Sequence, residues 1–164
     1  MSLIKKVLIA NRGEIAIRIS QAAAELGIST VSIYPEDDAS SLHIVKTDES
    51  VQIPGTGAQA YLDKLAVIEA AKELKVDAIH PGYGFLSENG DFAAAVEEAG
   101  LIFIGPCAET IRQMGDKAAA KTLMQAADVP VIPGQDGIVE ENFSTVAENI
   151  GFPLLVKAAA GGGG

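Results

Sequence analysis

Ten residues of varied chemistry, His80 to Asn89, follow the apolar pair Ala78-Ile79. This stretch, HPGYGFLSEN, combines an imidazole, a phenol, a carboxylate and two glycines, whereas a structural turn needs only turn-forming residues. A histidine after a buried strand is more often a hydrogen-bonded structural residue than a catalyst, and Glu88 can serve as a charge at a helix start. The stretch is therefore either a tight turn or one wall of an active site.

A second candidate site lies near the end of the sequence, where Lys157 precedes the glycine run 161–164. Glycines let backbone N–H groups approach phosphate oxygens without obstruction by Cβ atoms, and a lysine adds positive charge. The alternative is a flexible linker, because glycine-rich runs usually are linkers. Since the lysine comes before the glycines, the run is not a Walker P-loop.

The segment Asn11–Ala16 contains a single glycine, whereas the dinucleotide fingerprint requires three at fixed offsets. An NAD or FAD enzyme is therefore disfavoured. Arg12 and Glu14 either serve a site or form capping and ion-pair contacts at a helix start, and we weigh these interpretations equally. Cys107 is expected to be a small buried residue and His43 to lie at the surface. No pair of His, Cys or carboxylate residues has metal-ligand spacing, so no metal site is expected within the chain.

Composition restricts the classes of protein. The 164 residues are 48% apolar and 21% charged, as in a globular protein with a core, and the single cysteine excludes an internal disulfide. A net charge of −10 disfavours a nucleic-acid partner. The sequence has neither a signal peptide nor an apolar run of membrane-spanning length, so we expect no membrane association and a cytoplasmic protein, with a mature organellar matrix protein as the alternative.

The apolar patterns predict alternating strands and helices. Strands are expected at 7–10, 29–34, 51–53, 78–79 and 101–104, and helices at 14–26, near 65–74 and near 92–99. In the first helix an apolar face is shared by Ile15, Ile19, Ala22 or Ala23, and Leu26. This alternation predicts an α/β fold with an open parallel sheet flanked by helices, Rossmann-like but without the dinucleotide fingerprint. Ligands of such sheets bind at the carboxyl ends of the strands, where both Asn11–Ala16 and HPGYGFLSEN lie.

Beyond residue 104 the pattern changes. A helix is expected at 116–127, a connector at 129–134, a helix near 143–150 and a strand at 154–157. The closing glycines suggest that the chain is a fragment cut within a glycine-rich loop.

Five segments occur in an order that resembles a known family: VLIANRGEIAIRI, AIHPGYGFLSEN, IFIGP, MGDKAAAK and GFPLLVKAAAGGGG. They resemble the successive motifs of biotin carboxylase, the ATP-dependent component of acetyl-CoA, propionyl-CoA and pyruvate carboxylases. The resemblance implies an N-terminal pre-ATP-grasp domain at 1–113 and the incomplete start of an ATP-grasp domain at 114–164.

The resemblance also implies a reaction. MgATP and bicarbonate would form carboxyphosphate, whose carboxyl group is transferred to N1′ of biotin, and the fragment alone would be inactive because the main catalytic and metal-binding residues of the family lie beyond Gly164. By the same resemblance, ATP would be bound by Lys117, Lys157, Gly163 and Gly164. The loop at the biotin and bicarbonate pocket would use His80, Tyr83, Gly84 and Glu88.

The partners implied are a biotin carboxyl carrier domain and a carboxyltransferase component. A homodimer through Arg18, Gln21 and Glu25 is also implied, with a solvated helix face as the alternative. Two other functions remain open: a biotin-independent ATP-grasp ligase, and a non-catalytic nucleotide-binding or assembly module on the same fold.

Overall fold

The computed structural model describes residues 4–115, 117–134 and 143–156. The chain divides into two compact units, Met1–Arg112 and Gln113–Gly164. Among the described residues, no helix is long and apolar enough to cross a membrane.

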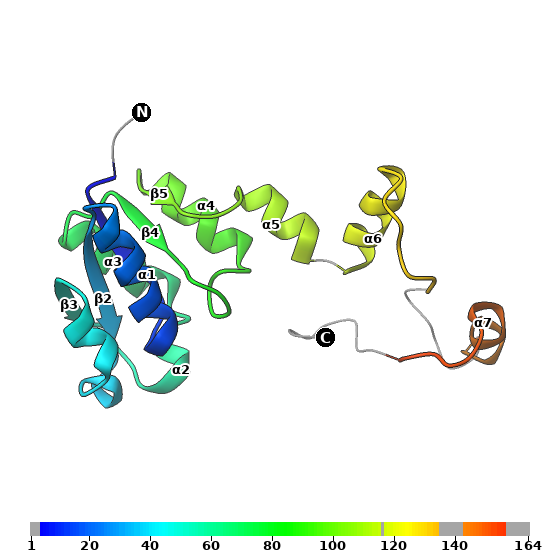
Figure 1. The fold of residues 1–164 in the computed structure, drawn as a ribbon, viewed down its shortest axis with the longest axis horizontal. Helices are drawn as coiled ribbons and strands as arrows, with labels where there is room; N and C mark the ends of the chain where they lie inside the picture. The colour runs from blue at the N-terminus through cyan, green and yellow to red at the C-terminus, as the bar shows by residue number, and fades with distance from the viewer. Residues whose placement is uncertain (1–3, 116, 135–142, 157–164) are drawn as a thin grey trace. The chain divides into compact units, whose positions relative to one another are not determined.

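A five-stranded sheet forms the centre of the first unit (Figure 1). Its strands run in the order β3-β2-β1-β4-β5, and every neighbouring pair is parallel. Their bounds are β1 Lys6–Ile9, β2 Ser29–Tyr34, β3 Glu49–Gln52, β4 Ala78–His80 and β5 Ile102–Phe103. The predicted open parallel α/β sheet is therefore confirmed, with strand ends displaced by one or two residues.

Helices connect the strands, and two of them, α3 and α4, begin with a side-chain cap. The bounds are α1 Gly13–Glu25, α2 Gly57–Ala60, α3 Lys64–Glu73, α4 Gly90–Glu98 and α5 Ala108–Gly115, with 3-10 turns η1 Glu36–Asp38 and η2 Leu42–Lys46. The Asp63 carboxylate accepts the N–H groups of Leu65 and Ala66 at the start of α3. The Asn89 side chain accepts the N–H of Phe92 at the start of α4. These caps satisfy donors that would otherwise lack a partner.

The two faces of the sheet are covered by different helices. Leu8 and Ile79 belong to the main core, which also contains Val67 of α3 and Phe92 of α4. Because side chains alternate along a strand, the neighbouring Val7 and Ala78 face the other way. They pack with Ala23 of α1. Thus α3 and α4 cover one face, and α1 covers part of the other.

The sheet changes its winding direction between β1 and β4. These strands are neighbours, with Ile9 opposite His80, yet α1 and α4, the first helices after them, lie on opposite faces. The chain therefore leaves these two strands toward opposite faces, and such a switch point is the usual ligand position in doubly wound sheets. The fold thus brings Asn11–Ala16 and His80–Asn89 to one place.

The buried face of α1 shares only Ala23 with the predicted apolar face. The helix also buries Ala16 and Ser20, whereas Leu26 is 76% exposed. Small residues at the contact let the helix lie close to the sheet, and the Ser20 hydroxyl donates to the Lys46 carbonyl oxygen at 2.6 Å. The larger apolar side chains consequently lie beside the contact instead of in it.

Two further burial predictions were wrong. His43 is fully buried, because η2 packs on β2 and α1 with this position inward, and its Nε2 donates to the Ile33 carbonyl oxygen at 3.2 Å. Cys107 is exposed at the residue before α5, whose buried positions are Ala108 and Ile111. In both cases the direction of the side chain on its turn decided burial, and residue type did not.

The second unit contains α6, Lys117–Ala126, and α7, Phe143–Ile150, which confirms the two predicted helices. Val146 and Ala147 of α7 are buried. Residues 154–156 do not form the predicted strand. An apolar run supplies side chains for burial, but a strand also needs a neighbouring backbone to pair with.

Candidate functional site

The loops after β1 and β4 are joined by the side chain of Asn11, which is fully buried. Its amide nitrogen donates to the Pro81 carbonyl oxygen at 2.8 Å and to the Tyr83 carbonyl oxygen at 3.0 Å. The predicted position of both loops at carboxyl ends of strands is confirmed, and the structure adds that the two loops are in contact. Asn11 itself was not predicted as a site residue.

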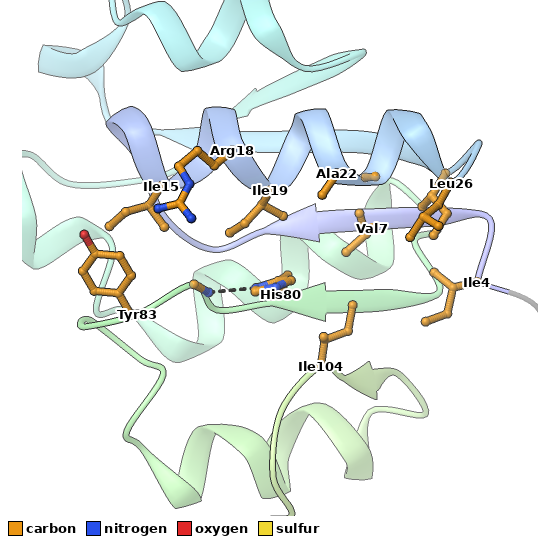
Figure 2. A pocket seen from close by; sticks show the side chains of 13 residues that line it. Ile4, Val7, Ile15, Arg18, Ile19, Ala22, Leu26, His80, Tyr83 and Ile104 are labelled. Atoms are coloured by element: carbon orange, nitrogen blue, oxygen red, sulfur yellow. Dashed lines mark hydrogen bonds between the residues drawn. The ribbon is translucent and has the colours of Figure 1, made fainter.

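His80 is half-buried at the end of β4, and its ring braces the loop that follows. Its Nδ1 accepts the N–H of Gly82 at 3.0 Å (Figure 2). Burial lowers the pKa of His80, so the ring is neutral at pH 7. Because Nδ1 is an acceptor in this bond, the single proton lies on Nε2, which makes Nε2 a hydrogen-bond donor.

Tyr83 lies at the open end of the loop and is 62% exposed. Its hydroxyl donates to Oε1 of Glu14 at 3.1 Å, and this hydrogen bond, with the charge of Glu14, raises the pKa of Tyr83. Glu14 also lies 3.8 Å from the Arg18 guanidinium, one helical turn away. All three side chains are exposed, so these contacts orient the tyrosine without adding much stability.

The remaining two predicted loop residues contribute differently. Gly84 has φ +64°, a backbone conformation that L side chains rarely adopt, and no atom lies within 4 Å of the position a Cβ would take. Glu88 is exposed, and no described residue offers its side chain a hydrogen bond or ion pair. Among these four residues, therefore, the His80 ring holds the loop by a hydrogen bond, and the Glu88 side chain lies exposed.

An apolar groove runs between α1 and the β1–β4 part of the sheet (Figure 2). Its apolar lining comes from Ile4, Val7, Ile15, Ile19, Leu26 and Ile104. The apolar face of the first helix that the sequence predicted thus lines this groove. Arg18, His80 and Tyr83 are its polar members, while Gln21 and Glu25 lie exposed elsewhere on α1.

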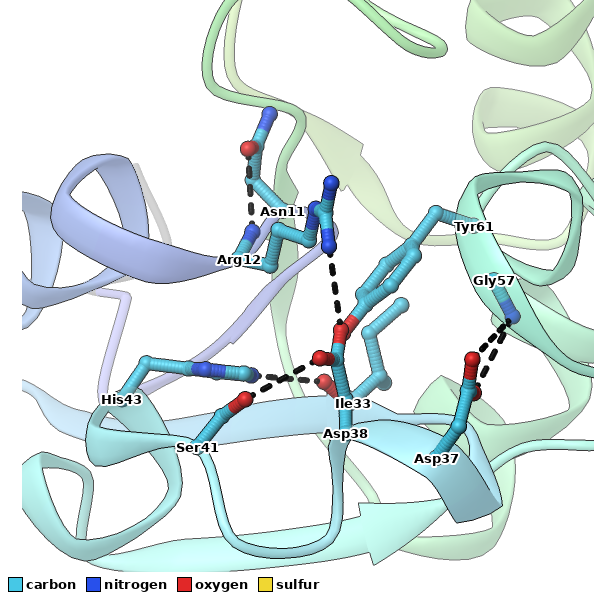
Figure 3. A network of polar contacts seen from close by, with 9 residues as sticks. All are labelled: Asn11, Arg12, Ile33, Asp37, Asp38, Ser41, His43, Gly57 and Tyr61. Carbon is cyan, nitrogen blue, oxygen red and sulfur yellow. Dashed lines mark hydrogen bonds and ion pairs between the residues drawn. The ribbon is translucent and has the colours of Figure 1, made fainter.

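A polar cluster that the sequence analysis missed lies at the same edge of the sheet (Figure 3). Asp38 accepts hydrogen bonds from the hydroxyls of Tyr61 at 2.8 Å and Ser41 at 3.1 Å, and the Arg12 guanidinium lies 3.4 Å away. That guanidinium also lies 5.9 Å from the ring centroids of both Tyr61 and Phe85. The sequence showed only a turn at 35–38; its position after β2, at the carboxyl edge, was the available indication.

Titration in this cluster follows from its contacts. Burial alone would raise the pKa of Asp38, but the hydrogen bonds from Tyr61 and Ser41 and the charge of Arg12 outweigh it, so the pKa is lowered. Burial, followed by the hydrogen bond to Asp38, raises the pKa of Tyr61 far above its ordinary value. Asp38 is therefore charged and Tyr61 neutral throughout the physiological range.

The predicted ATP-binding residues fall mainly outside this description. Lys117 is the first residue of α6. Lys157, Gly163 and Gly164 lie outside the described residues. Within the described part of the chain no three His, Cys, Asp or Glu side chains gather as a metal ion would require, so we assign no chemical step to a metal there.

The parallel sheet, its reversal of winding at β1 and β4 and the single-glycine loop together define an open, doubly wound α/β domain without the dinucleotide fingerprint. The sequence model of "Biotin carboxylase, N-terminal domain" matches residues 3–111, about two thirds of the chain. That of "Carbamoyl-phosphate synthase L chain, ATP binding domain" matches residues 116–164. The chain belongs to the biotin carboxylase family, as its motifs predicted.

Individual relatives agree with this assignment. Biotin carboxylase of Allochromatium vinosum is 53% identical over 167 positions, which cover 99% of this chain and 37% of the relative. Pyruvate carboxylase of Staphylococcus aureus is 54% identical over 100% of this chain and 15% of its own. The chain thus spans about a third of the biotin carboxylase relative and less of the pyruvate carboxylase.

Among solved structures, the biotin carboxylase domain of Hydrogenobacter thermophilus 2-oxoglutarate carboxylase has a TM-score of 0.92 and 47% identity. The match covers 99% of this chain and 36% of that one. That structure is a domain dimer in complex with MgADP, ADP and bicarbonate.

Proposed function

We propose that this chain provides the N-terminal part of a biotin carboxylase that uses MgATP and bicarbonate to carboxylate biotin. The observation that carries the proposal is the family match over residues 3–111. The ligands of the H. thermophilus domain, MgADP and bicarbonate, support the same ligand classes here.

The proposed reaction has two balanced steps. A bicarbonate oxygen attacks the γ-phosphorus of ATP, the bond to the ADP oxygen breaks, and carboxyphosphate forms. The carboxyl carbon then bonds to N1′ of biotin as its bond to the phosphate oxygen breaks, and N1′ loses its proton. Phosphoryl transfer depends mainly on positioning and charge neutralisation. In a chain of net charge −10, that neutralisation requires placed cations, and we propose Lys117 and Lys157, together with the N–H groups of Gly163 and Gly164.

We propose that His80, Tyr83, Gly84 and Glu88 belong to the wall of the biotin and bicarbonate pocket. The geometry supports His80 best, because its Nε2–H is a neutral donor that suits a carbonyl or carboxylate oxygen. Tyr83 is exposed and is held by Glu14, as a residue that meets a ligand would be. Gly84 keeps the loop free of side-chain bulk.

The partners proposed are a biotin carboxyl carrier domain and a carboxyltransferase component. The relatedness to pyruvate carboxylase of S. aureus supports them. A homodimer through Arg18, Gln21 and Glu25 is supported by the exposure of these side chains on α1 and by the dimeric H. thermophilus domain. Turnover is proposed to need the portion of the relatives that this chain does not span, so residues 1–164 alone should cleave little ATP.

The test is ATP cleavage by the complete product of the reading frame and by residues 1–164, each with and without bicarbonate and free biotin. Bicarbonate-dependent cleavage that rises with biotin, seen only in the complete product, is the expected result. Cleavage that ignores biotin would replace the proposal with a biotin-independent ATP-grasp ligase. A complete product that cleaves no ATP would favour a non-catalytic module. ATP turnover by residues 1–164 would contradict the proposal that turnover needs the portion of the relatives that this chain does not span.

A further inference from the structure

Every hydrogen-bonding group of the buried Asn11 side chain is used by backbone. Its Oδ1 accepts the N–H of Arg12 at 2.9 Å, and its Nδ2 donates to the carbonyl oxygens of Pro81 and Tyr83. Carbonyl oxygens only accept, so the amide can be oriented in one way. One side chain from the β1 loop thereby fixes two backbone positions of the β4 loop.

Gly82 lies between those two carbonyl groups and packs directly on Asn11. A Cβ at Gly82 would lie 2.6 Å from Nδ2 of Asn11 and 2.8 Å from Cγ2 of Ile15, and its φ is +69°. Both the distances and the backbone conformation therefore require glycine. The N–H of the same residue donates to Nδ1 of His80. The contacts run without a break from Asn11 through the turn at 81–83 to the imidazole.

We propose that Asn11 is a positioning residue, which holds the turn at 81–83 so that His80 keeps its proton on Nε2 and Tyr83 stays at the mouth of the groove. Its relevance to carboxylation rests on the proposed function, in which this loop faces substrate. The contacts themselves do not depend on that function, and they can be tested on residues 1–164 without ATP or biotin.

Asn11→Asp removes both donors with almost no change in volume. At neutral pH it places a carboxylate oxygen against two carbonyl oxygens, so the turn is expected to open. His80 then loses the N–H that occupies its Nδ1, and its ring is free to exchange between tautomers. The matched control is Asn89→Asp, which makes the same change at the other end of the loop but keeps a capping acceptor for the Phe92 N–H.

Nitrogen-15 NMR of histidine-labelled protein measures the tautomer of His80 directly, because the chain has only two histidines, His43 and His80. His43 donates from Nε2 to the Ile33 carbonyl oxygen and serves as an internal reference. In the native chain and in Asn89→Asp, His80 should show a protonated Nε2 and an unprotonated Nδ1. In Asn11→Asp the two His80 resonances should move toward each other while those of His43 stay in place. An unchanged His80 pattern in folded Asn11→Asp would overturn the proposal.

A second route guards against a variant that fails to fold. Gly82→Ala disturbs the same contact from the loop side and should alter His80 in the same way; an unchanged pattern would again refute the proposal. Chymotryptic cleavage after Tyr83 should rise roughly 10-fold or more in Asn11→Asp, since two hydrogen bonds that close the loop are lost. Urea unfolding of the same samples separates this local opening from a global loss of stability. If ATP assays refute carboxylation while His80 responds as expected, only the proposed function fails.

Discussion

The hydrogen bond from Tyr61 to Asp38 should make a measurable contribution to stability, and a double-mutant cycle isolates it. Tyr61→Phe removes only the hydroxyl that donates to Asp38 at 2.8 Å. The ring stays in place, stacked on Phe85 with centroids 5.3 Å apart. Asp38→Ala removes the acceptor, and the double variant removes both groups.

The expected magnitude follows from burial and charge. Hydrogen bonds to charged groups contribute roughly 1.5–3 kcal/mol. The Asp38 side chain is 20% exposed and keeps Ser41 and Arg12 as partners. We therefore expect a coupling energy between Tyr61 and Asp38 at the lower end of that range, about 1.5 kcal/mol. Asp38→Ala alone should cost more, about 2–3 kcal/mol, because it leaves the buried Tyr61 hydroxyl without an acceptor.

Urea unfolding followed by circular dichroism measures the four free energies at pH 7. Tyr34→Phe is the matched control, since no described group bonds its hydroxyl, and it should change stability by less than about 0.5 kcal/mol. The pKa of Asp38 is lower in the folded chain than its ordinary value of 3.8, so the carboxylate stabilises the fold above that pH. This contribution is lost as the pH falls through the folded pKa, and the coupling should shrink with it. A coupling below about 0.3 kcal/mol at pH 7 would refute the role given to this hydrogen bond.

Three further predictions use other parts of the first unit. The raised pKa of Tyr61 means that its phenol stays neutral in the folded chain. Absorbance at 295 nm should therefore show equal tyrosine ionisation in the native chain and in Tyr61→Phe until alkaline unfolding. An additional ionisation step in the native chain before unfolding would contradict this. Asp63→Ala should destabilise by about 1 kcal/mol in urea because α3 loses its cap, while Asp63→Asn should cost only a few tenths. The exposed Cys107 should react with a disulfide reagent without denaturant, and an unreactive thiol would disprove its exposed position. Because the hydrogen bonds from Thr110 lower the pKa of Cys107, Thr110→Val should shift the pH midpoint of the reaction rate upward.

The sequence was sufficient for the five strands of the sheet and for placing both loops at carboxyl ends of strands. Short apolar runs such as Val7–Ala10 fit strands that are buried on both faces, and Gly27 and Gly100 mark helix ends with positive φ. The carboxyl ends of parallel strands share one edge of a sheet. Once the alternation of strands and helices was recognised, the placement of 11–16 and 80–89 at that edge followed from topology. Their contact follows from the pairing of β1 with β4, which the structure supplies.

Burial of individual side chains was harder to predict, because it depends on how a helix is rotated about its axis against the sheet. On α1 the apolar periodicity pointed to Ile15 and Leu26, but the small residues at Ala16 and Ser20 permit a closer contact with the sheet. His43 is buried because its ring reaches a backbone carbonyl oxygen of β2, a contact between residues ten positions apart that no local pattern encodes. The Asp38–Tyr61 bond, across 23 positions, was missed for the same reason.

The structure also decides between the two interpretations of Arg12. Its guanidinium is engaged by Asp38 at 3.4 Å and lies over the rings of Tyr61 and Phe85. A phosphate ligand at this guanidinium would have to compete with the Asp38 carboxylate. Arg12 therefore serves to tie the β1 loop to the Tyr61–Phe85 stack, and its charge is already neutralised. If the proposed function holds, the cations for nucleotide phosphates would come from elsewhere, and Lys117 and Lys157 of the second unit are the ones proposed for them.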